Sequence, residues 1–214
     1  MASIPNPQGF CHFNSERLVY RAVEDCDSDK EFLQNGILND PTIQTMSTSR
    51  IKRPKSLKTA EDFVKMIQDS LLGVIICLPP PPETSTPVTN GPTPKPKPKP
   101  VPIGHMSVFY TLPPGSEQNR CAMLGLSLAE GFRGKGYGGE AINWALDWAF
   151  QHAGLHRVSI CAFSYNVNAL KLYRKLGFVD EGREREAVYH QRSWHDLVIL
   201  GMLEDEWEVL RGIK

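Results

Sequence analysis

The chain has 214 residues, 41% of them apolar and 22% charged, with 24 basic and 24 acidic side chains, a composition that suits a single domain with a hydrophobic core. The balanced charge disfavours nucleic acid and anionic membranes as partners, and the longest apolar run, Leu71 to Leu78, is shorter than the roughly 20 residues of a membrane-spanning helix. Because residues 1 to 8 lack the features of a secretory signal and the five cysteines show no metal-binding spacing, we expect a cytoplasmic protein with reduced thiols and no bound metal.

The first part of the chain predicts a strand, two helices and a second strand. Residues 17 to 23 alternate polar and apolar side chains, which is the period of a half-buried strand. A helix is expected from about residue 27 to 37, where Asn39-Asp40-Pro41 ends it, and another from 57 to 70. The short β-branched run from 72 to 78 is typical of a buried strand.

A proline-rich segment, residues 79 to 102, holds most of the chain's 17 prolines and cannot join a packed core. Its prolines favour an extended path, and Asn90-Gly91 near its middle predicts a reversal. We therefore interpret it as an insertion within one domain, residues 15 to 207, with 1 to 14 as an N-terminal extension and 208 to 214 as a C-terminal tail. Its P-x-x-P motifs could also bind a partner protein, although a plain spacer is the commoner role.

The second part of the chain predicts a hairpin followed by alternating helices and strands. Strands are expected at 103 to 112, 121 to 128, 156 to 163, 178 to 189 and 194 to 203, and helices at 139 to 152 and 169 to 176. This order mixes hairpins with crossovers, so we expect a single domain of the α/β (α+β) class with a mixed central sheet.

Residues 131 to 139, Gly-Phe-Arg-Gly-Lys-Gly-Tyr-Gly-Gly, join a predicted strand to a predicted helix. Glycines let backbone N–H groups approach a ligand, and the helix that follows adds unpaired N–H groups and a partial positive charge. This turn therefore predicts a phosphate site, the alternative being a tight turn that only feeds the helix.

Two familiar phosphate-binding patterns fit the turn poorly. The spacing Gly134-x-Gly136-x-x-Gly139 formally matches a dinucleotide fingerprint, but residues 159 to 165 lack the acidic residue that this fold requires about 20 positions later. A nucleotide P-loop needs Ser or Thr after Lys135, where Gly136 stands.

A third pattern fits. The spacing Arg133-x-x-Gly136-x-Gly138 resembles the Q/R-x-x-G-x-G/A pyrophosphate loop of the GNAT superfamily of acetyl-CoA-dependent N-acetyltransferases. Residues 166 to 178 supply every fixed position of a second motif of that superfamily, N-x-x-A-x-x-x-Y-x-K-x-G-F. Further segments resemble the branch that acetylates the N-terminal residues of ribosomal proteins: 15 to 21, 38 to 41, Asp196 and 206 to 207. The resemblance covers about residues 15 to 78 and 103 to 207.

The resemblance implies a sheet whose fourth and fifth strands, 121 to 128 and 156 to 163, splay apart to admit acetyl-CoA. The residues that it assigns to the cofactor are Leu126, Ser127, Leu128, Arg133, Gly134, Lys135, Gly136, Tyr137, Gly138, Asn166 and Tyr173. It places the phenol of Tyr173 beside the departing sulfur, as a general acid. Asn166 has a structural alternative as the N-cap of the next helix, and both roles could hold.

The implied function is acetyl transfer from acetyl-CoA to a primary amine of a peptide or small molecule. The sequence does not identify the base: Glu140, His105 and Asp196 are candidates, each with a structural alternative. The loop from Asp40 to Lys58 is basic and by resemblance borders the acceptor, which favours an acidic acceptor, although a solvated loop is the default. The alternative function is a catalytically silent module that docks partners through its proline-rich arm. The oligomeric state is not predicted.

Overall fold

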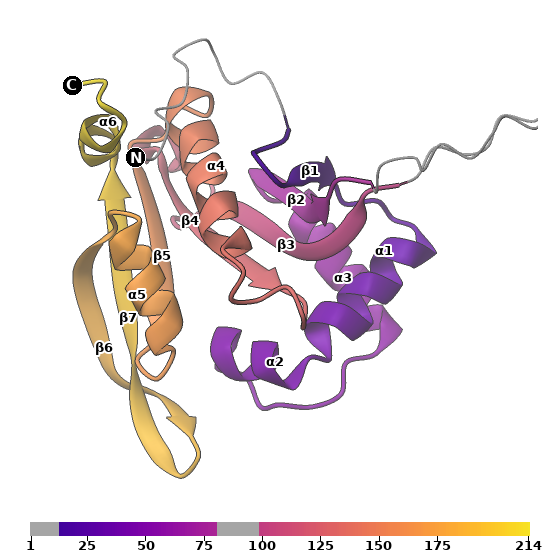
Figure 1. The fold of residues 1–214 in the computed structure, drawn as a ribbon. Helices are drawn as coiled ribbons and strands as arrows, with labels where there is room; N and C mark the ends of the chain where they lie inside the picture. The colour runs from indigo at the N-terminus through magenta and orange to yellow at the C-terminus, as the bar shows by residue number, and fades with distance from the viewer. Residues whose placement is uncertain (1–12, 81–98) are drawn as a thin grey trace, which may run out of the picture.

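The computed structural model describes residues 13 to 80 and 99 to 214. Most of the predicted N-terminal extension and of the proline-rich segment, including its partner-binding motifs, lies outside the described residues. Seven strands form one sheet in the order β1-β2-β3-β4-β5-β7-β6, and helices cover it (Figure 1).

The strands are β1 Val19–Ala22, β2 Leu72–Leu78, β3 Val101–Tyr110, β4 Cys121–Leu128, β5 Arg157–Phe163, β6 Val179–His190 and β7 Ser193–Leu203. The helices are α1 Asp27–Glu31, the π-helix η1 Phe32–Leu38, α2 Pro41–Ser47, α3 Leu57–Gln68, the 3-10 turn η2 Glu117–Asn119, α4 Tyr137–Gln151, α5 Val167–Lys175 and α6 Glu204–Arg211. Within the described part of the chain, no helix is long and apolar enough to cross a bilayer.

All neighbouring strands are antiparallel except β4 and β5, which confirms the predicted mixed sheet. These two parallel strands pair only where residues 121 to 123 of β4 meet 157 to 159 of β5, and then diverge. Figure 1 shows the two strands separating toward their carboxyl ends. The second half of β4 therefore pairs with β3 alone and leaves one edge of its backbone facing the opening, as the predicted splay requires.

The expectation that residues 40 to 58 form a loop is wrong in its first part, because α2 begins at Pro41. Asn39-Asp40-Pro41 does end the preceding helix, but the same residues start the next one. Proline fits the first helical position, and the Asp40 carboxylate accepts hydrogen bonds from the amides of Thr42 at 2.8 Å and Ile43 at 3.0 Å. The same three residues end one helix and begin the next, and the prediction considered only the helix end.

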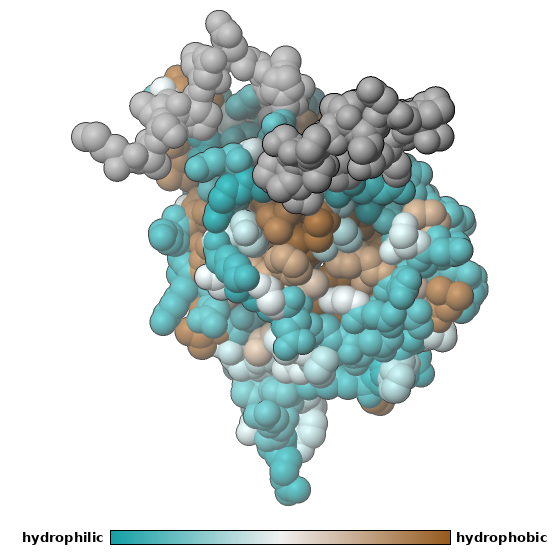
Figure 2. Space-filling model, turned by 45° about the vertical axis from the view of Figure 1, so that its right-hand side comes forward, coloured by the Kyte–Doolittle hydropathy of each residue, from teal (hydrophilic) through white to brown (hydrophobic). Residues whose placement is uncertain are grey.

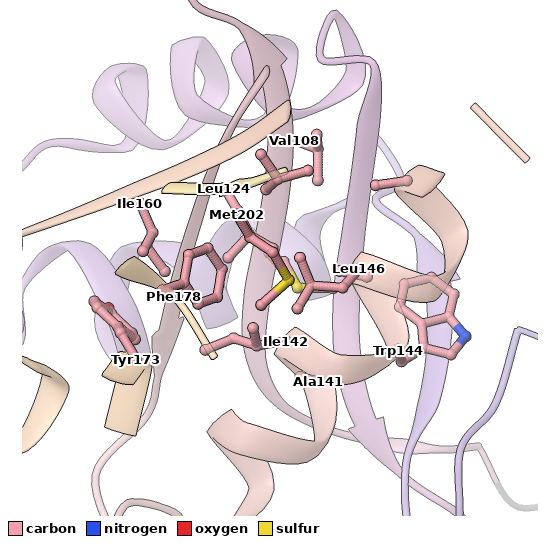
Figure 3. Packing of buried hydrophobic residues seen from close by; sticks show 14 of the residues in the cluster. Val108, Leu124, Ala141, Ile142, Trp144, Leu146, Ile160, Tyr173, Phe178 and Met202 are labelled. Carbon is pink, nitrogen blue, oxygen red and sulfur yellow. The ribbon is translucent and has the colours of Figure 1, made fainter. Parts of the chain in front are cut away.

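The hydrophobic core has two parts. The larger cluster packs α4 and α5 against the sheet, and Figure 3 shows Val108, Leu124, Ile142, Ile160 and Met202 within it. The smaller cluster joins α3 and η1 to β2 through residues such as Leu33, Ile67 and Ile75.

Two elements differ from the predicted boundaries. Val101 pairs with Leu78, so the chain on both sides of the proline-rich segment belongs to one sheet, and β3 includes the last two residues of that segment. The helix α6, which was not predicted, crosses residue 207, where the sequence analysis ended the domain. Trp207 anchors it, because the indole is buried and its Nε1 donates to Asp147 at 2.9 Å.

Candidate functional site

The glycine-rich turn leads directly into α4, which begins at Tyr137 rather than at the predicted residue 139. Gly134 and Gly136 have φ values of 73° and 85°, a conformation that side chains rarely adopt. The amides of Gly134, Gly136 and Gly138 find no acceptor among the described residues. The turn therefore presents unsatisfied N–H groups at the positive end of a helix of 15 residues, an arrangement suited to an anion.

Glu140 in the first turn of α4 holds the start of the domain against this turn. Its carboxylate accepts from the Ser15 hydroxyl at 2.7 Å, the Arg17 amide at 2.7 Å and the Arg17 Nε at 2.8 Å. These contacts give Glu140 the structural role that was its alternative to acting as a base.

Arg17 was missed as a site residue, although it lies at the glycine-rich turn. Its Nη1 donates to the Lys135 carbonyl at 3.1 Å, and the guanidinium carbon lies 4.8 Å from the centre of the Tyr137 ring. A Cβ placed on Gly136 would come within 3.2 Å of its Nη2. Arg17 thus places a guanidinium, paired with Glu140, beside the free amides.

The side chain of Arg133, a predicted pyrophosphate residue, turns toward α2. Its Nε donates to the Leu128 carbonyl at 2.8 Å, and its Nη2 forms an ion pair with Asp40. Burial works against ionisation of the Asp40 carboxyl, but the Ile43 amide and the Arg133 guanidinium outweigh it and lower the pKa of this group. The guanidinium thereby fastens the start of α2 to the end of β4.

The other end of α2 is held at the end of β5. The Tyr165 hydroxyl, two residues beyond that strand, donates to the Thr45 carbonyl at 2.6 Å. Since Asp40 is bound near the end of β4 and Thr45 near the end of β5, α2 bridges the open end of the splay (Figure 1). Leu126, Ser127 and Leu128 lie on the part of β4 that faces this opening.

Tyr173, the predicted general acid, lies on α5 with 9% of its surface exposed, and Figure 3 shows its ring beside the buried cluster. Burial raises the pKa of its phenol to about 12, and the nearby Cys161 thiol of β5 adds to the shift. The phenol is therefore protonated at neutral pH and can donate. Asn166 caps α5 by accepting from the Ala169 amide at 3.3 Å, which is the structural alternative expected for it.

The other two base candidates occupy structural positions. His105 on β3 is 8% exposed, its Nδ1 has no partner in the described chain, and burial lowers the pKa of its imidazole to about 4. Asp196 accepts from the Glu186 amide at 2.9 Å and from Arg183 Nη1 at 3.0 Å.

An open groove beyond the end of β5 contains polar residues that sequence reasoning missed. It is lined by Thr45, Met46, Lys52, Tyr165, His190, Gln191 and His195. The Tyr165 ring lies 4.7 Å from that of His190 and 4.9 Å from that of His195. Reduced hydration, the Lys52 ammonium and the His195 ring lower the pKa of His190. No local signal marks this group, because its members come from four separate parts of the chain.

One face of the molecule has an apolar hollow surrounded by polar residues. Figure 2 shows hydrophobic residues gathered in a hollow on one face, with hydrophilic residues around it. Within residues 13 to 80 and 99 to 214, no three His, Cys, Asp or Glu side chains are placed to hold a metal ion.

Two curated relatives match parts of the chain. The protein named "Putative ribosomal N-acetyltransferase YdaF" from Bacillus subtilis (strain 168) is 37% identical over 90 residues, 42% of this chain and 49% of that protein. Spermidine N(1)-acetyltransferase from Vibrio cholerae serotype O1 is 29% identical over 89 residues, 42% of this chain and 51% of that protein. The chain spans about half the length of the curated relatives it matches.

Solved structures share the whole fold. A spermidine N-acetyltransferase from Vibrio cholerae, in complex with CoA and spermine, has a TM-score of 0.67 and 21% identity over 90% of this chain and 99% of that one. An acetyltransferase of the GNAT family from Bacillus anthracis has a TM-score of 0.65 and 18% identity over 90% and 98% of the two chains. The family model described as the acetyltransferase (GNAT) domain matches residues 17 to 179, most of the chain, and the chain therefore belongs to the GNAT acetyltransferase family.

Proposed function

We propose that the protein transfers the acetyl group of acetyl-CoA to a primary amine by direct attack within a ternary complex. The observation that carries this proposal is the set of free amides at Gly134, Gly136 and Gly138, placed at the start of α4 next to the end of the splayed strand β4. Anion-binding amides beside an unpaired strand edge suit a molecule with a diphosphate at one end and an amide-containing arm at the other.

The described residues fit such a cofactor. The amides of the turn would bind the diphosphate, and the free edge of β4 at Leu126 to Leu128 would pair with the amides of the pantetheine arm as an added strand does. Acetyl-CoA supplies an acetyl group activated as a thioester. Because β5 has already diverged at these residues, no strand in the described part of the chain pairs with that edge.

Tyr173 would act as the general acid. As the amine nitrogen bonds to the acetyl carbon, the carbon–sulfur bond breaks, and the phenol donates its proton to the sulfur. The amine loses one proton to a base or to water. The phenol of Tyr173 is protonated at neutral pH, as a proton donor must be, and burial raises its pKa further.

The test has two stages. Saturating acetyl-CoA, at one hundred times its dissociation constant, should raise the free energy of unfolding by about 2.7 kcal/mol, measured by thermal or chemical unfolding. CoA release should then be followed with a panel of amines and N-terminal peptides. No stabilisation at millimolar acetyl-CoA would contradict the proposal and favour a silent module, while cofactor binding without acetylation of any amine would contradict the enzymatic role alone.

A further inference from the structure

We propose that the acceptor is a peptide amino terminus followed closely by acidic residues, and that residues 49 to 56, hereafter the basic loop, bind those residues. This inference rests on the proposed acetyl transfer. The basic loop carries Arg50, Lys52, Arg53 and Lys55 within eight positions and has no acidic residue. It connects α2, which bridges the splay, to α3.

The four cations of the basic loop have no acidic partner among the described residues. The next basic residue along the chain behaves differently: Lys58 Nζ lies 3.0 Å from Asp62 on the same helix. A solvated basic surface usually carries acidic side chains among its basic ones. Four unneutralised cations in one loop instead produce a local positive potential that attracts an anionic partner.

The backbone of the basic loop is held in place while its charged ends remain free. Buried Gln44 receives a hydrogen bond from the Arg53 amide and donates one to the Arg53 carbonyl, each at 3.2 Å. Asn39 binds Lys55 in the same two-way manner, at 2.7 Å from the Lys55 amide and 3.0 Å from its carbonyl. A fixed backbone reduces the entropy lost on binding, as expected of a surface arranged for a ligand.

Two open depressions contain parts of the basic loop. Lys52 reaches the groove of Tyr165, His190 and His195, with its Nζ 3.3 Å from His190 Nδ1. The second depression is lined by Ser49, Arg50, Ile51, Arg53, Pro54, Lys55, Ser56 and Thr59. Among the residues that the structure describes, no acidic side chain lines either one. Because both are open and share one loop, they suit an extended chain better than a small molecule that must be enclosed.

The groove adjoins the end of β5, one of the two splayed strands. Cys161 and Phe163 are two positions apart on β5, so their side chains project from the same face of the strand. Tyr165 stacks on Phe163 at 5.4 Å and also contacts both imidazoles of the groove. These rings therefore connect the groove to the end of β5, which forms one side of the splay. An amino terminus in the splay would leave its following residues over the basic loop.

The charges also disfavour a polyamine, the substrate named for one relative, as the acceptor. A polycation would approach Lys52 and the other cations of the basic loop, and none of the described residues that line the two depressions is a carboxylate. Asp196, on β7 beside the groove residue His195, is already paired with Arg183.

The experiment compares two hexapeptides that differ only in charge, one beginning Ser-Asp-Glu and the other Ser-Lys-Lys. With acetyl-CoA we expect kcat/KM to be at least about tenfold higher for the acidic peptide at low salt, and the difference to shrink as salt increases. Fluorescence anisotropy of the same peptides, labelled at their carboxyl ends and titrated with the CoA-bound protein, measures binding independently of turnover.

The variant Arg50→Ala/Lys52→Ala should remove most of this preference, both in turnover and in binding. The control Lys58→Ala/Lys65→Ala changes the net charge equally but lies on α3, outside both depressions, and should retain it. Equal or better use of the basic peptide or of spermidine would overturn the inference while leaving acetyl transfer intact. If no amine is acetylated, the proposed function fails, and the anisotropy still decides whether the basic loop selects acidic peptides.

Discussion

The turn before α4 offers backbone amides, whereas the groove beyond β5 offers side chains. The first is made by consecutive residues, 131 to 139, and the second collects residues from α2, the basic loop, the segment after β5 and the β6–β7 hairpin. A backbone site has no side chain to remove, so it is disrupted only by adding atoms or by straining the chain. In a side-chain site, each substitution removes one group and lowers binding by that group's own contribution.

The sharpest test of the backbone site is Gly136→Val. Valine at φ 85° would be strained, and its Cβ would lie 3.2 Å from Arg17 Nη2, so we expect cofactor binding to be lost. The stabilisation of about 2.7 kcal/mol expected from acetyl-CoA at one hundred times its dissociation constant should then disappear from unfolding curves.

Gly131→Val is the matched control for that variant. Gly131 has a similar φ of 83°, but nothing lies within 4 Å of an added Cβ, and the residue precedes the free amides. It should cost stability while retaining the response to acetyl-CoA. Normal cofactor affinity in Gly136→Val would show that the turn does not bind the diphosphate.

His105, on the strand next to β4, makes the fold sensitive to acid. Its pKa is lowered to about 4 in the folded protein from an ordinary 6.5, so between these values the unfolded chain binds a proton that the folded chain does not. Stability should therefore be complete above pH 6.5 and fall by about 3 kcal/mol as the pH drops to 4.

The variant His105→Phe should remove this part of the pH dependence, as measured by urea unfolding at pH 7, 5.5 and 4. Its absolute stability is less informative, because the ring also packs edge-on against Phe63 at 4.9 Å. An unchanged slope in the variant would assign the acid sensitivity to other groups.

Tyr173→Phe tests the proposed donation of a proton to the departing sulfur. Removing the proposed proton donor should lower kcat about a hundredfold and leave the affinity for acetyl-CoA nearly unchanged. Tyr110→Phe is a suitable control, because Tyr110 ends β3 opposite Ala122, where β4 and β5 are still paired. Full activity in Tyr173→Phe would exclude the phenol as the acid.

Asp40 links α2 to Arg133 of the glycine-rich turn. Its variants should have the smallest effects on stability. Asp40→Asn keeps an oxygen that can cap α2 but loses the ion pair with Arg133, while Asp40→Ala loses both. We expect a loss of about 1 kcal/mol for the first variant and about 2 kcal/mol for the second, measured by urea unfolding. Equal losses would mean that the ion pair, and not the cap, holds the helix.

Local features of the sequence predicted much of this molecule. The glycine-rich turn, the motif around Tyr173 and most strands depend on contacts within a few residues, and their periodicity or spacing indicates them directly. The same reasoning missed α2 and α6. In α2 the starting signal coincides with the end of the preceding helix, and α6 is anchored by the contact between Trp207 and Asp147, which are far apart in sequence.

By itself, the sequence determined that the chain has a mixed α/β fold with a turn of exposed amides at a helix start, because these properties depend on short-range backbone preferences. Only the tertiary structure decided how the rest of the site is assembled. In the folded chain, Arg133 pairs with Asp40, and the hydrogen bond from Tyr165 to Thr45 holds α2 across the splay. The imidazoles of His190 and His195 lie beside Lys52. Tyr165 and Thr45 are 120 positions apart, and no local pattern encodes a contact over that separation.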